Sequence, residues 1–344
     1  MKIAVTGLNN NDNPGPGVPL IRSIKEYPDF NGEFIGLHYD TLEPGIYMEN
    51  LKTKSYIIPY PYQGPEALLS RLLYIHQKEK IDVIIPTLDS ELYNFIHISQ
   101  ELDDAGIKTF LPTIENLENR SKDKLFKYCK ETGIDSPITF VVNSLEQVNE
   151  VLEKLKYPVV VKGIFYEAYV CYKYDQVVSS FTRIASKWGL PIIIQEYLVG
   201  DEFNVCALGD GEGNTIGAVA MRKLFITEKG KGWAGITISD EKLIELTQRV
   251  IRTLKWRSGL ELEILKSKDD GKYYLLEINS RFPAWIYLTQ AAGQNLPYML
   301  VKLAFGESVE PMSDYEIGKM FVRCSLDLIS DIRTYEKLSV FGEL

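Results

Sequence analysis

Short apolar runs alternate with segments of helical periodicity along the first third of the chain. Apolar runs of strand length predict strands, and apolar residues three and four positions apart predict helices. This pattern predicts strands over residues 2–6, 33–37, 82–85 and 107–111, and helices over residues 18–27, 65–78 and 90–105. Strands separated by such helices form a parallel sheet with helices on both faces. We therefore predict a doubly wound α/β domain that binds ligands beyond the carboxyl ends of its strands.

The pattern changes after about residue 112, where strands begin to predominate. Helices are predicted over residues 121–132, 145–155, 176–188 and 240–254. Strands are predicted over residues 138–142, 158–162, 192–195, 203–208, 215–221, 260–265 and 273–278. Further helices should follow Pro283. This order is typical of an α+β fold with a mainly antiparallel sheet, capped by helices.

Composition and charge narrow the class of protein. The 344 residues are 45% apolar, and 38 Lys and Arg against 47 Asp and Glu give a net charge of −9. An acidic chain is a poor electrostatic partner for nucleic acid. No apolar run approaches the length of about 18 residues that a membrane span needs, and the N-terminal run is too short for a signal peptide. We therefore expect a cytoplasmic protein whose partners include neither nucleic acid nor a membrane.

Cysteine and histidine contribute little candidate chemistry. The four cysteines are widely scattered and form no CxxC pair, which indicates neither a zinc site nor a dense disulfide frame. The chain has only three histidines. Catalysis would therefore rest on carboxylates, lysine, arginine or a metal ion.

Polar side chains follow two of the predicted parallel strands. Asn9 and residues 10–12 lie in the loop after the first strand, and Asp89 follows the strand at 82–85. The first loop contains neither GxGxxG nor a Walker-A motif, which disfavours Rossmann-type NAD binding and P-loop chemistry. Amides and carboxylates suit an amino group and hydroxyls, so we expect an amino acid or small peptide as substrate. Ordinary turn chemistry is the alternative explanation of an Asn-rich loop.

A hairpin rich in acidic residues is predicted in the last third of the chain. Asp270-Gly271 lies between two apolar-rich segments, which is a hairpin signal. Because strand side chains alternate, Glu261 and Glu263 share a face of the first strand. The midpoint between Glu263 and Glu277 is residue 270, so these two carboxylates are predicted to lie roughly opposite one another. Like charges in that position destabilise a sheet unless a cation lies between them.

This hairpin predicts a magnesium site. Asn279 shares a strand face with Glu277, and carboxylate and amide oxygens are ligands that Mg²⁺ accepts together with water and phosphate oxygens. Glu263, Glu277 and Asn279 are therefore candidate metal ligands. Arg281, two residues further on, suits an anion held beside the metal. A solvated strand face with alternating charge would produce the same pattern and stays open as the alternative.

Other residues that could bind a ligand lie at the ends of predicted strands. Lys162 ends one apolar strand, and Arg222 and Lys223 follow another. Such cations can bind phosphate or simply mark a strand end in solvent. Glu196 and Glu202 lie around a short polar turn, where a carboxylate can accept hydrogen bonds from an adenine amino group or from ribose hydroxyls.

Taken together and in order, these segments resemble the ATP-grasp superfamily over residues 1 to about 305. They are most similar to single-unit relatives of the carbamoyl-phosphate synthetase large subunit and, more loosely, to biotin carboxylase. The most specific match is the Glu-x-Asn-x-Arg pattern of Glu277, Asn279 and Arg281. The resemblance implies a pre-ATP-grasp substrate domain at 1–115, a lid subdomain at 116–196 and a C-terminal subdomain with the metal site at 197–344.

The resemblance also implies ATP and Mg²⁺ as cofactors, with Mn²⁺ as an alternative ion, and a role for each matching residue. The implied nucleotide-binding residues are Lys124, Lys162, Glu196, Tyr197, Leu198 and Glu202. The implied metal ligands are Glu263, Glu277 and Asn279, and the implied catalytic cations are Arg281, Arg222 and Lys223.

The implied activity is an ADP-forming ligase reaction that passes through an acylphosphate. An amino acid or small carboxylate would be activated and then joined to an amine, a thiol or another nucleophile. The single ATP-grasp unit and the absence of the further C-terminal domain of biotin carboxylase disfavour the specific activities of the two named relatives. The family is often dimeric, so a homodimer is an expected assembly.

Two rival functions stay open. A kinase-type phosphotransferase would use the same nucleotide site, and a nucleotide-binding module without turnover would use its binding half alone. Many family members carry a glycine-rich loop over the triphosphate, whereas residues 163–170 contain a single glycine. This loop supports the binding module, and the retained metal-ligand pattern argues against it.

Overall fold

The computed structural model describes residues 1–9, 14–164, 167–227 and 232–344. The chain forms two compact units. Unit 1 comprises Met1–Asn116, Asn204–Glu261 and Asn279–Leu344, and unit 2 comprises Leu117–Phe203 and Leu262–Ile278. The first stretch of unit 1 ends at Asn116, and the subdomain boundaries at 115 and 196 stay predictions. The predicted segment 197–344 is divided between the units because the hairpin at 262–278 packs with residues 117–203.

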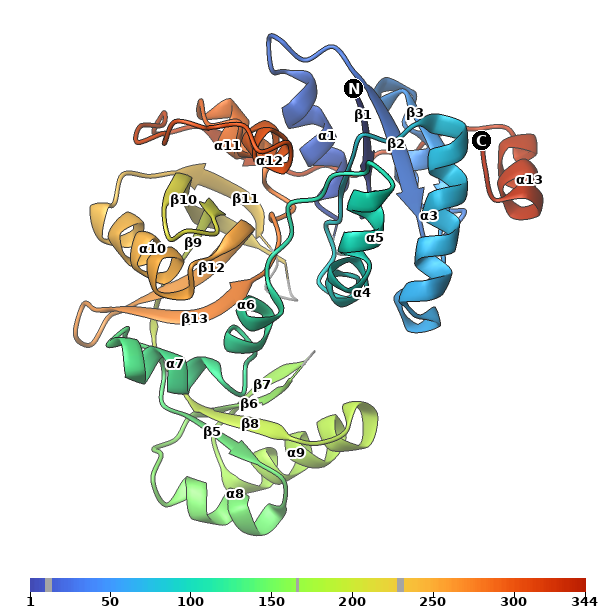
Figure 1. Ribbon diagram of the computed structural model, residues 1–344. Helices are drawn as coiled ribbons and strands as arrows, with labels where there is room; N and C mark the ends of the chain where they lie inside the picture. The colour runs from blue at the N-terminus through green and yellow to red at the C-terminus, as the bar shows by residue number, and fades with distance from the viewer. Residues whose placement is uncertain (10–13, 165–166, 228–231) are drawn as a thin grey trace. The chain divides into compact units, whose positions relative to one another are not determined.

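Unit 1 begins with a four-stranded parallel sheet (Figure 1). Its strands, in the spatial order β3-β2-β1-β4, are β1 (Lys2–Val5), β2 (Glu33–His38), β3 (Thr53–Ile57) and β4 (Val83–Ile85). Ile3 and Val5 of β1 pack in a core with α1 (Gly17–Lys25), whereas Ala4 packs in a core with α3 (Pro65–Glu79). Successive residues of β1 therefore face helices on opposite sides, which confirms the doubly wound sheet.

Some elements of this sheet differ from the prediction. β3 has the sequence TKSYI, and this short, partly polar strand lies at the sheet edge, where long apolar runs are avoided. The strand predicted at 107–111 is reduced to a parallel bridge between Val83 and Lys108. The helix predicted at 90–105 is divided at Ile98. The other helices here are α2 (Pro44–Tyr47), η1 (Glu49–Leu51), η2 (Pro61–Gln63), α4 (Leu92–His97) and α5 (Ser99–Asp104).

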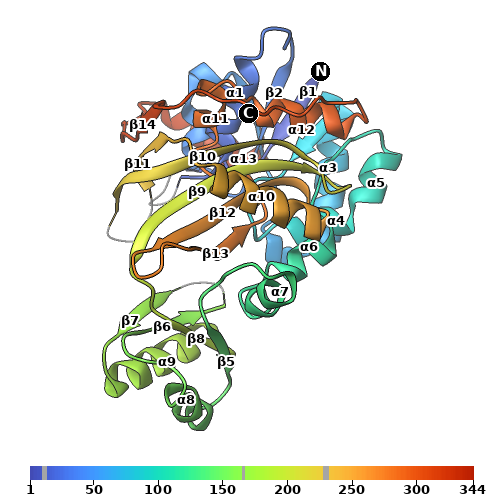
Figure 2. The same ribbon diagram turned by 90° about the vertical axis from the view of Figure 1, so that its left-hand side faces the viewer.

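A six-stranded sheet follows with the order β13-β12-β9-β10-β11-β14. Its strands are β9 (Gly200–Asp210), β10 (Thr215–Ile226), β11 (Gly232–Thr237), β12 (Arg257–Ser267), β13 (Tyr273–Asn279) and β14 (Met320–Val322). β11 pairs antiparallel with β10 and β14, in keeping with the predicted antiparallel sheet, although β11 and β14 themselves were not predicted. The associated helices are α10 (Glu241–Leu254), α11 (Tyr287–Ala291), α12 (Leu296–Ala304) and α13 (Ile332–Phe341). α10 packs on β10 across this sheet (Figure 2).

Unit 1 has one core that joins its two sheets. Val5 of the parallel sheet and Leu20 of α1 lie in the same buried cluster as Leu208, Met221 and Phe282 from the second half of the chain. The carboxyl ends of β1 and β4 are therefore held in one packed body with the residues that follow β13.

Unit 2 is built on an antiparallel sheet with the order β5-β8-β6-β7. Its elements are α6 (Ile114–Asn119, which begins in unit 1), α7 (Leu125–Thr132), β5 (Thr139–Val142), α8 (Leu145–Leu152), β6 (Val159–Gly163), β7 (Ala168–Cys171), α9 (Tyr174–Trp188) and β8 (Ile192–Glu196). Val161 and Ile194 point into the core beneath α8 and α9, which lie on one side of the sheet. Their strand neighbours Lys162, Ile193 and Gln195 therefore face the other side.

A buried carboxylate joins the carboxyl ends of β1 and β4 in unit 1. Glu91 is 0% exposed and accepts hydrogen bonds from the backbone nitrogens of Thr87 at 2.8 Å and Leu88 at 2.9 Å. The hydroxyls of Thr6 and Tyr39 donate to it as well. Burial raises the pKa of the Glu91 carboxyl, and these four donors oppose that rise.

Glu91→Ala is expected to destabilise unit 1. The Thr87 N–H keeps a second acceptor, Thr6 Oγ1 at 2.9 Å, but the other three donors lose the acceptor that Glu91 provides. A buried unsatisfied donor costs about 1–3 kcal/mol, so the free energy of unfolding should fall by roughly 3 kcal/mol or more. Urea denaturation measures this change. The matched control is Glu101→Ala on the exposed face of α5, which should change the free energy of unfolding by less than about 0.5 kcal/mol. Equal effects of the two substitutions would contradict the assignment.

Candidate functional site

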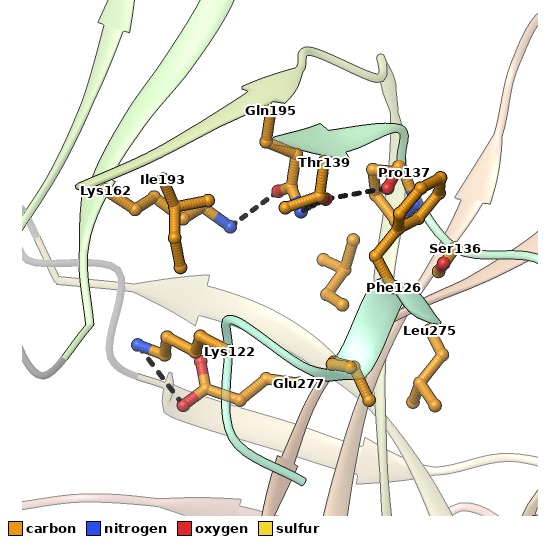
Figure 3. A pocket seen from close by; sticks show the side chains of 12 residues that line it. Lys122, Phe126, Ser136, Pro137, Thr139, Lys162, Ile193, Gln195, Leu275 and Glu277 are labelled. Atoms are coloured by element: carbon orange, nitrogen blue, oxygen red, sulfur yellow. Dashed lines mark hydrogen bonds and ion pairs between the residues drawn. The ribbon is translucent and has the colours of Figure 1, made fainter. Parts of the chain in front are cut away.

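A pocket in unit 2 contains two of the site residues predicted from the sequence, Lys162 and Glu277 (Figure 3). It is lined by Lys122, Leu125, Phe126, Ser136, Pro137, Thr139, Lys162, Ile193, Gln195, Leu275, Leu276 and Glu277. These residues come from α7 and the turn before it, from β5 and the segment before it, and from β6, β8 and β13. Apolar walls with a few convergent polar groups are typical of a small-molecule site.

Strand register places three polar side chains of the pocket in a row. Lys162 of β6 lies directly opposite Ile193 of β8, and Gln195 of β8 lies opposite Thr139 of β5. Lys162 Nζ donates to Gln195 Oε1 at 2.7 Å, and Gln195 Nε2 donates to Thr139 Oγ1 at 2.8 Å (Figure 3). The lysine is thereby held at one defined position on the pocket side of the sheet.

The electrostatic surroundings of Lys162 bring four predicted site residues together. Burial lowers the pKa of the Lys162 ammonium group, and Lys122 lowers it further by charge repulsion. The carboxylates of Glu277, Glu263 and Glu202 act in the opposite direction and raise the pKa of Lys162. Two predicted metal ligands and the predicted ribose contact therefore lie within electrostatic range of the predicted phosphate lysine.

The lysine that enters the pocket from the start of α7 is Lys122. Its Nζ lies 3.5 Å from Glu277 Oε1. The predicted nucleotide lysine, Lys124, is not among the pocket-lining residues, and its Nζ lies 3.4 Å from Glu118 Oε2 in an exposed ion pair. The two lysines are two positions apart just before a helix, so sequence spacing alone does not tell which one faces the pocket.

The predicted hinge contributes Gln195 to the pocket, whereas its predicted nucleotide-binding residues are Glu196, Tyr197 and Leu198. Adjacent strand residues face opposite sides, and the Glu196 carboxylate accepts a hydrogen bond from the backbone nitrogen of Ile138 at 2.7 Å. Tyr197 is exposed and Leu198 is half-buried after the strand end. Side chains two positions apart on a strand share a face, so Gln195 lies on the same face as Ile193, the strand partner of Lys162.

In unit 1, Arg281 is bound to an acidic residue from the N-terminal sheet. Arg281 Nε donates to Asp89 Oδ2 at 3.0 Å, and Ser280 Oγ donates to Asp89 Oδ1 at 2.9 Å. Arg281 Nη1 also lies 3.6 Å from Glu261 Oε2. Asp89, predicted to contact the acceptor substrate, is therefore tied to the predicted catalytic arginine. Asn9 is half-buried, and residues 10–12 lie outside the described residues.

Asn279 is held by a residue to which the sequence assigned no role. Asn279 is 8% exposed, and its Nδ2 donates to Glu261 Oε2 at 3.2 Å. Glu261 is itself 6% exposed. A glutamate buried next to other polar residues has no distinct signature in the sequence, because Glu261 and Glu263 occupy the same alternation of one strand.

The basic pair at residues 222–223 lies on β10 in unit 1, beside β11. Arg222 is exposed and Lys223 is half-buried. Neighbouring strand residues face opposite sides of a sheet, so Arg222 and Lys223 lie on different faces of β10.

Comparisons with known proteins agree with this architecture. Residues 190–321 match a family model described as ATP-grasp in the biosynthetic pathway with Ter operon. In structure, the chain is similar to the biotin carboxylase–βγ-ATP complex of Campylobacter jejuni, with a TM-score of 0.72 and 16% identity, over 93% of this chain and 74% of that one. The chain has an ATP-grasp fold. The predicted resemblance to the ATP-grasp superfamily is thus confirmed.

Two further solved structures share the ATP-grasp fold of this chain. One is the biotin carboxylase domain dimer of the 2-oxoglutarate carboxylase of Hydrogenobacter thermophilus with MgADP, ADP and bicarbonate, at a TM-score of 0.71 and 16% identity, over 90% of this chain and 70% of that one. The other is phosphoribosylglycinamide synthetase of Anaerococcus prevotii, with a TM-score of 0.64 and 16% identity, over 93% of this chain and 79% of that one.

The curated relatives that match this chain are longer proteins. It is 23% identical over 272 residues to the N-terminal section of the carbamoyl phosphate synthase large chain of Methanopyrus kandleri, and 24% identical over 284 residues to the carbamoyl phosphate synthase large chain of Methanothermobacter thermautotrophicus. Each match covers 72% of this chain, but 47% of the first relative and 26% of the second. The chain thus spans about half and about a quarter of their lengths.

The side chains of this ATP-grasp fold fit a magnesium–nucleotide ligand in their chemistry. Lys122 and Lys162 suit phosphate, and the apolar pocket walls suit a planar base. Among the described residues, no three His, Cys, Asp or Glu side chains lie together as a group that could hold a metal ion. The predicted set of two glutamates and Asn279 would be completed by phosphate oxygens, as is usual for Mg²⁺. Within the described ranges no helix is long and apolar enough to cross a membrane.

Proposed function

We propose that this protein is an ATP-dependent, ADP-forming ligase that joins a small carboxylate to an amine or to another nucleophile such as a thiol. The observation that carries the proposal is the meeting of Lys122 and Lys162 with the Glu277 carboxylate at one pocket of unit 2. The ATP-grasp fold and the similarity to carbamoyl phosphate synthase sequences support it. We place the protein in the cytoplasm, where ATP is available.

Binding and orientation are the main tasks of the chain's residues in such a reaction, because phosphoryl transfer needs little covalent chemistry from the protein. In the proposal, Lys122 and Lys162 bind the phosphates. Glu263, Glu277 and Asn279 would hold Mg²⁺, or Mn²⁺ in its place. The bound ion supplies charge neutralisation on the phosphate oxygens.

The proposed reaction has two steps. An oxygen of the substrate carboxylate attacks the γ-phosphorus of ATP, the bond to the β–γ bridging oxygen breaks, and acylphosphate and ADP form. The amine nitrogen then attacks the acyl carbon, inorganic phosphate leaves and the amine loses a proton. Arg281, together with whichever of Arg222 and Lys223 lies on the phosphate side of β10, is proposed to neutralise the charge that develops on the phosphate. Alignment of bound reactants can supply ~7–11 kcal/mol of the barrier.

An amino acid or small peptide is the proposed substrate class. Asn9 and Asp89 lie beyond β1 and β4, at the edge of the parallel sheet where ligands of such sheets bind. Asp89 also contacts Arg281 at 3.0 Å, so one ion pair joins the proposed substrate residues to a proposed catalytic cation. A homodimer is the proposed assembly.

The test of the proposed function is ADP release from ATP and Mg²⁺ with a panel of amino acids and small acids, each with and without an amine. ADP that appears only with acid plus amine, together with an amide product, supports the ligase. ADP with a stable phosphorylated product of one substrate indicates a kinase-type phosphotransferase. Tight ATP binding without ADP release across the panel indicates a nucleotide-binding module. Either of the last two results overturns the proposal.

The two lysines before α7 should differ in their effect on nucleotide binding. Lys122→Ala removes the ammonium that lies 3.5 Å from Glu277, so we expect ATP affinity to fall by about tenfold, equivalent to ~1.4 kcal/mol. Lys124→Ala removes an exposed ion pair with Glu118 and should change the affinity by less than about twofold. Isothermal titration calorimetry with ATP and Mg²⁺ compares them. If Lys124→Ala lost more ATP affinity than Lys122→Ala, the nucleotide lysine would be Lys124, as predicted from the sequence.

A further inference from the structure

Glu261 of β12 has a buried carboxylate whose two oxygens contact different residues. Its Oε1 accepts hydrogen bonds from Trp285 Nε1 at 2.7 Å and from Asn204 Nδ2 at 2.8 Å. All three residues belong to unit 1, and Glu261 is only 6% exposed. Two short hydrogen bonds to one oxygen hold the plane of the carboxylate in place, so that the second oxygen has a defined direction.

The second oxygen faces two residues of the proposed catalytic set. Glu261 Oε2 accepts a hydrogen bond from Asn279 Nδ2 at 3.2 Å and lies 3.6 Å from Arg281 Nη1. Asn279 is the proposed amide ligand of the metal ion, and Arg281 is a proposed cation for the phosphates. Glu261 therefore contacts one residue of each kind with the same oxygen.

This contact decides which atom of the Asn279 amide is presented on the other side. An ionised carboxylate only accepts hydrogen bonds, so it binds the amide nitrogen and never the amide oxygen. The amide oxygen of Asn279 consequently lies on the opposite edge of the group, where it can act as a metal ligand. Arg281 is oriented in the same way, between Glu261 and the Asp89 carboxylate at 3.0 Å.

We infer that Glu261 is a positioning residue of the metal–nucleotide site: its Oε2 turns the oxygen of Asn279 toward the metal ion and holds Arg281 beside it. The inference rests on the proposed function, because it gives Asn279 and Arg281 the roles proposed there. Residues that orient metal ligands from behind commonly change metal affinity by about 10–100-fold when they are replaced.

Glu261→Gln tests this role with little change in shape. Because two donors already occupy the Oε1 side, the NH₂ group that the substitution introduces would lie on the Oε2 side and face the NH₂ group of Asn279. Asn279 then loses the acceptor that Glu261 provides, and this contact no longer fixes the orientation of its amide. We expect the affinity for Mn²⁺, used as a paramagnetic substitute for Mg²⁺ in the presence of ADP, to fall at least about tenfold.

The readout is the amount of free Mn²⁺ measured by electron paramagnetic resonance, which needs no substrate and no turnover. Asn204→Ala is the matched control, because Trp285 Nε1 still donates to Oε1 and holds the carboxylate plane, and both contacts of Oε2 remain. It should lower the thermal unfolding temperature while Mn²⁺ affinity stays within about twofold of the parent protein. Glu261→Gln with unchanged Mn²⁺ affinity, or an equal loss of affinity in Asn204→Ala, would overturn the inference.

Glu261→Asp keeps the charge and withdraws the carboxylate by one methylene group, so it remains informative if the glutamine variant folds poorly. It should weaken Mn²⁺ binding about threefold or more, and unchanged binding in a folded Glu261→Asp protein would also refute the positioning role. The parent protein separates this outcome from failure of the proposed function. If the parent binds no Mn²⁺ with ADP, the proposed nucleotide site is wrong, whatever Glu261 does.

Discussion

Glu277→Ala is expected to abolish ATP turnover while leaving the protein folded. Glu277 is a proposed metal ligand, and its side chain lies at the nucleotide pocket 3.5 Å from Lys122. Charge stabilisation by a bound metal ion contributes several kcal/mol in such reactions, so turnover should fall by roughly 10³-fold. The side chain is 29% exposed, and a partly solvated ion pair of this kind contributes little to the free energy of unfolding.

Steady-state ADP release and a thermal unfolding curve measure the two parts of this prediction. Asn279→Ala should lose turnover as Glu277→Ala does, because it removes the proposed amide ligand from the same strand. Asp269→Asn, at an exposed position in the turn of this hairpin, is the matched control and should retain the turnover of the parent protein. Near-normal turnover in either Glu277→Ala or Asn279→Ala would show that the metal assignment is wrong.

Lys162→Met is expected to cause the largest loss of nucleotide affinity. The substitution keeps a long side chain on β6 but removes the ammonium group that Gln195 holds at 2.7 Å. A hydrogen bond that involves a charged group contributes about 1.5–3 kcal/mol, and a loss near 2.7 kcal/mol corresponds to a roughly 100-fold weaker ATP complex. Calorimetric titration with ATP and Mg²⁺ measures this change. ATP affinity within twofold of the parent protein would remove Lys162 from the site.

The same lysine makes ATP binding sensitive to alkaline pH. Burial lowers the pKa of Lys162 below the ordinary lysine value of 10.5, so its proton is lost at a lower pH than that of an exposed lysine. Only the protonated form attracts phosphate, and ATP affinity should therefore decrease as pH rises through this lowered pKa. Lys162→Arg keeps its charge throughout this range, because a guanidinium group stays protonated at every pH at which the protein is folded. The affinity of this variant should vary less with pH, and equal pH profiles would contradict the explanation.

Local patterns were sufficient for most of the fold. The residues of β1 alternate between two cores, and α1 and α3 have apolar residues at helical spacing, so both periods are visible along the chain. The hairpin between β12 and β13 followed from Asp270-Gly271, and Gly271 has the positive φ of +71° that such a turn requires. β3 was missed because an edge strand with two polar residues and a lysine lacks a distinctive apolar run.

The candidate site was predictable only where strand periodicity applied to it. Lys162 and Glu277 could be placed because each lies on a strand with a clear alternation, and both line the same pocket. Lys122 could not be distinguished from Lys124, because both precede α7 and the packing of that helix decides which one reaches the pocket. Glu196 was predicted to bind the nucleotide, but strand alternation from Ile193 places Gln195 at the pocket.

The sequence by itself determined the order of most strands and helices, the hairpin with its acidic and amide residues, and the resemblance to ATP-grasp proteins. Only the tertiary structure decided which side chains are buried together and which atoms they present. Lys162 meets Gln195 across 33 positions, and Arg281 meets Asp89 across 192. The physical reason is that periodicity is a property of neighbouring residues, whereas desolvation, pKa shifts and hydrogen-bond direction depend on groups that only folding brings into contact.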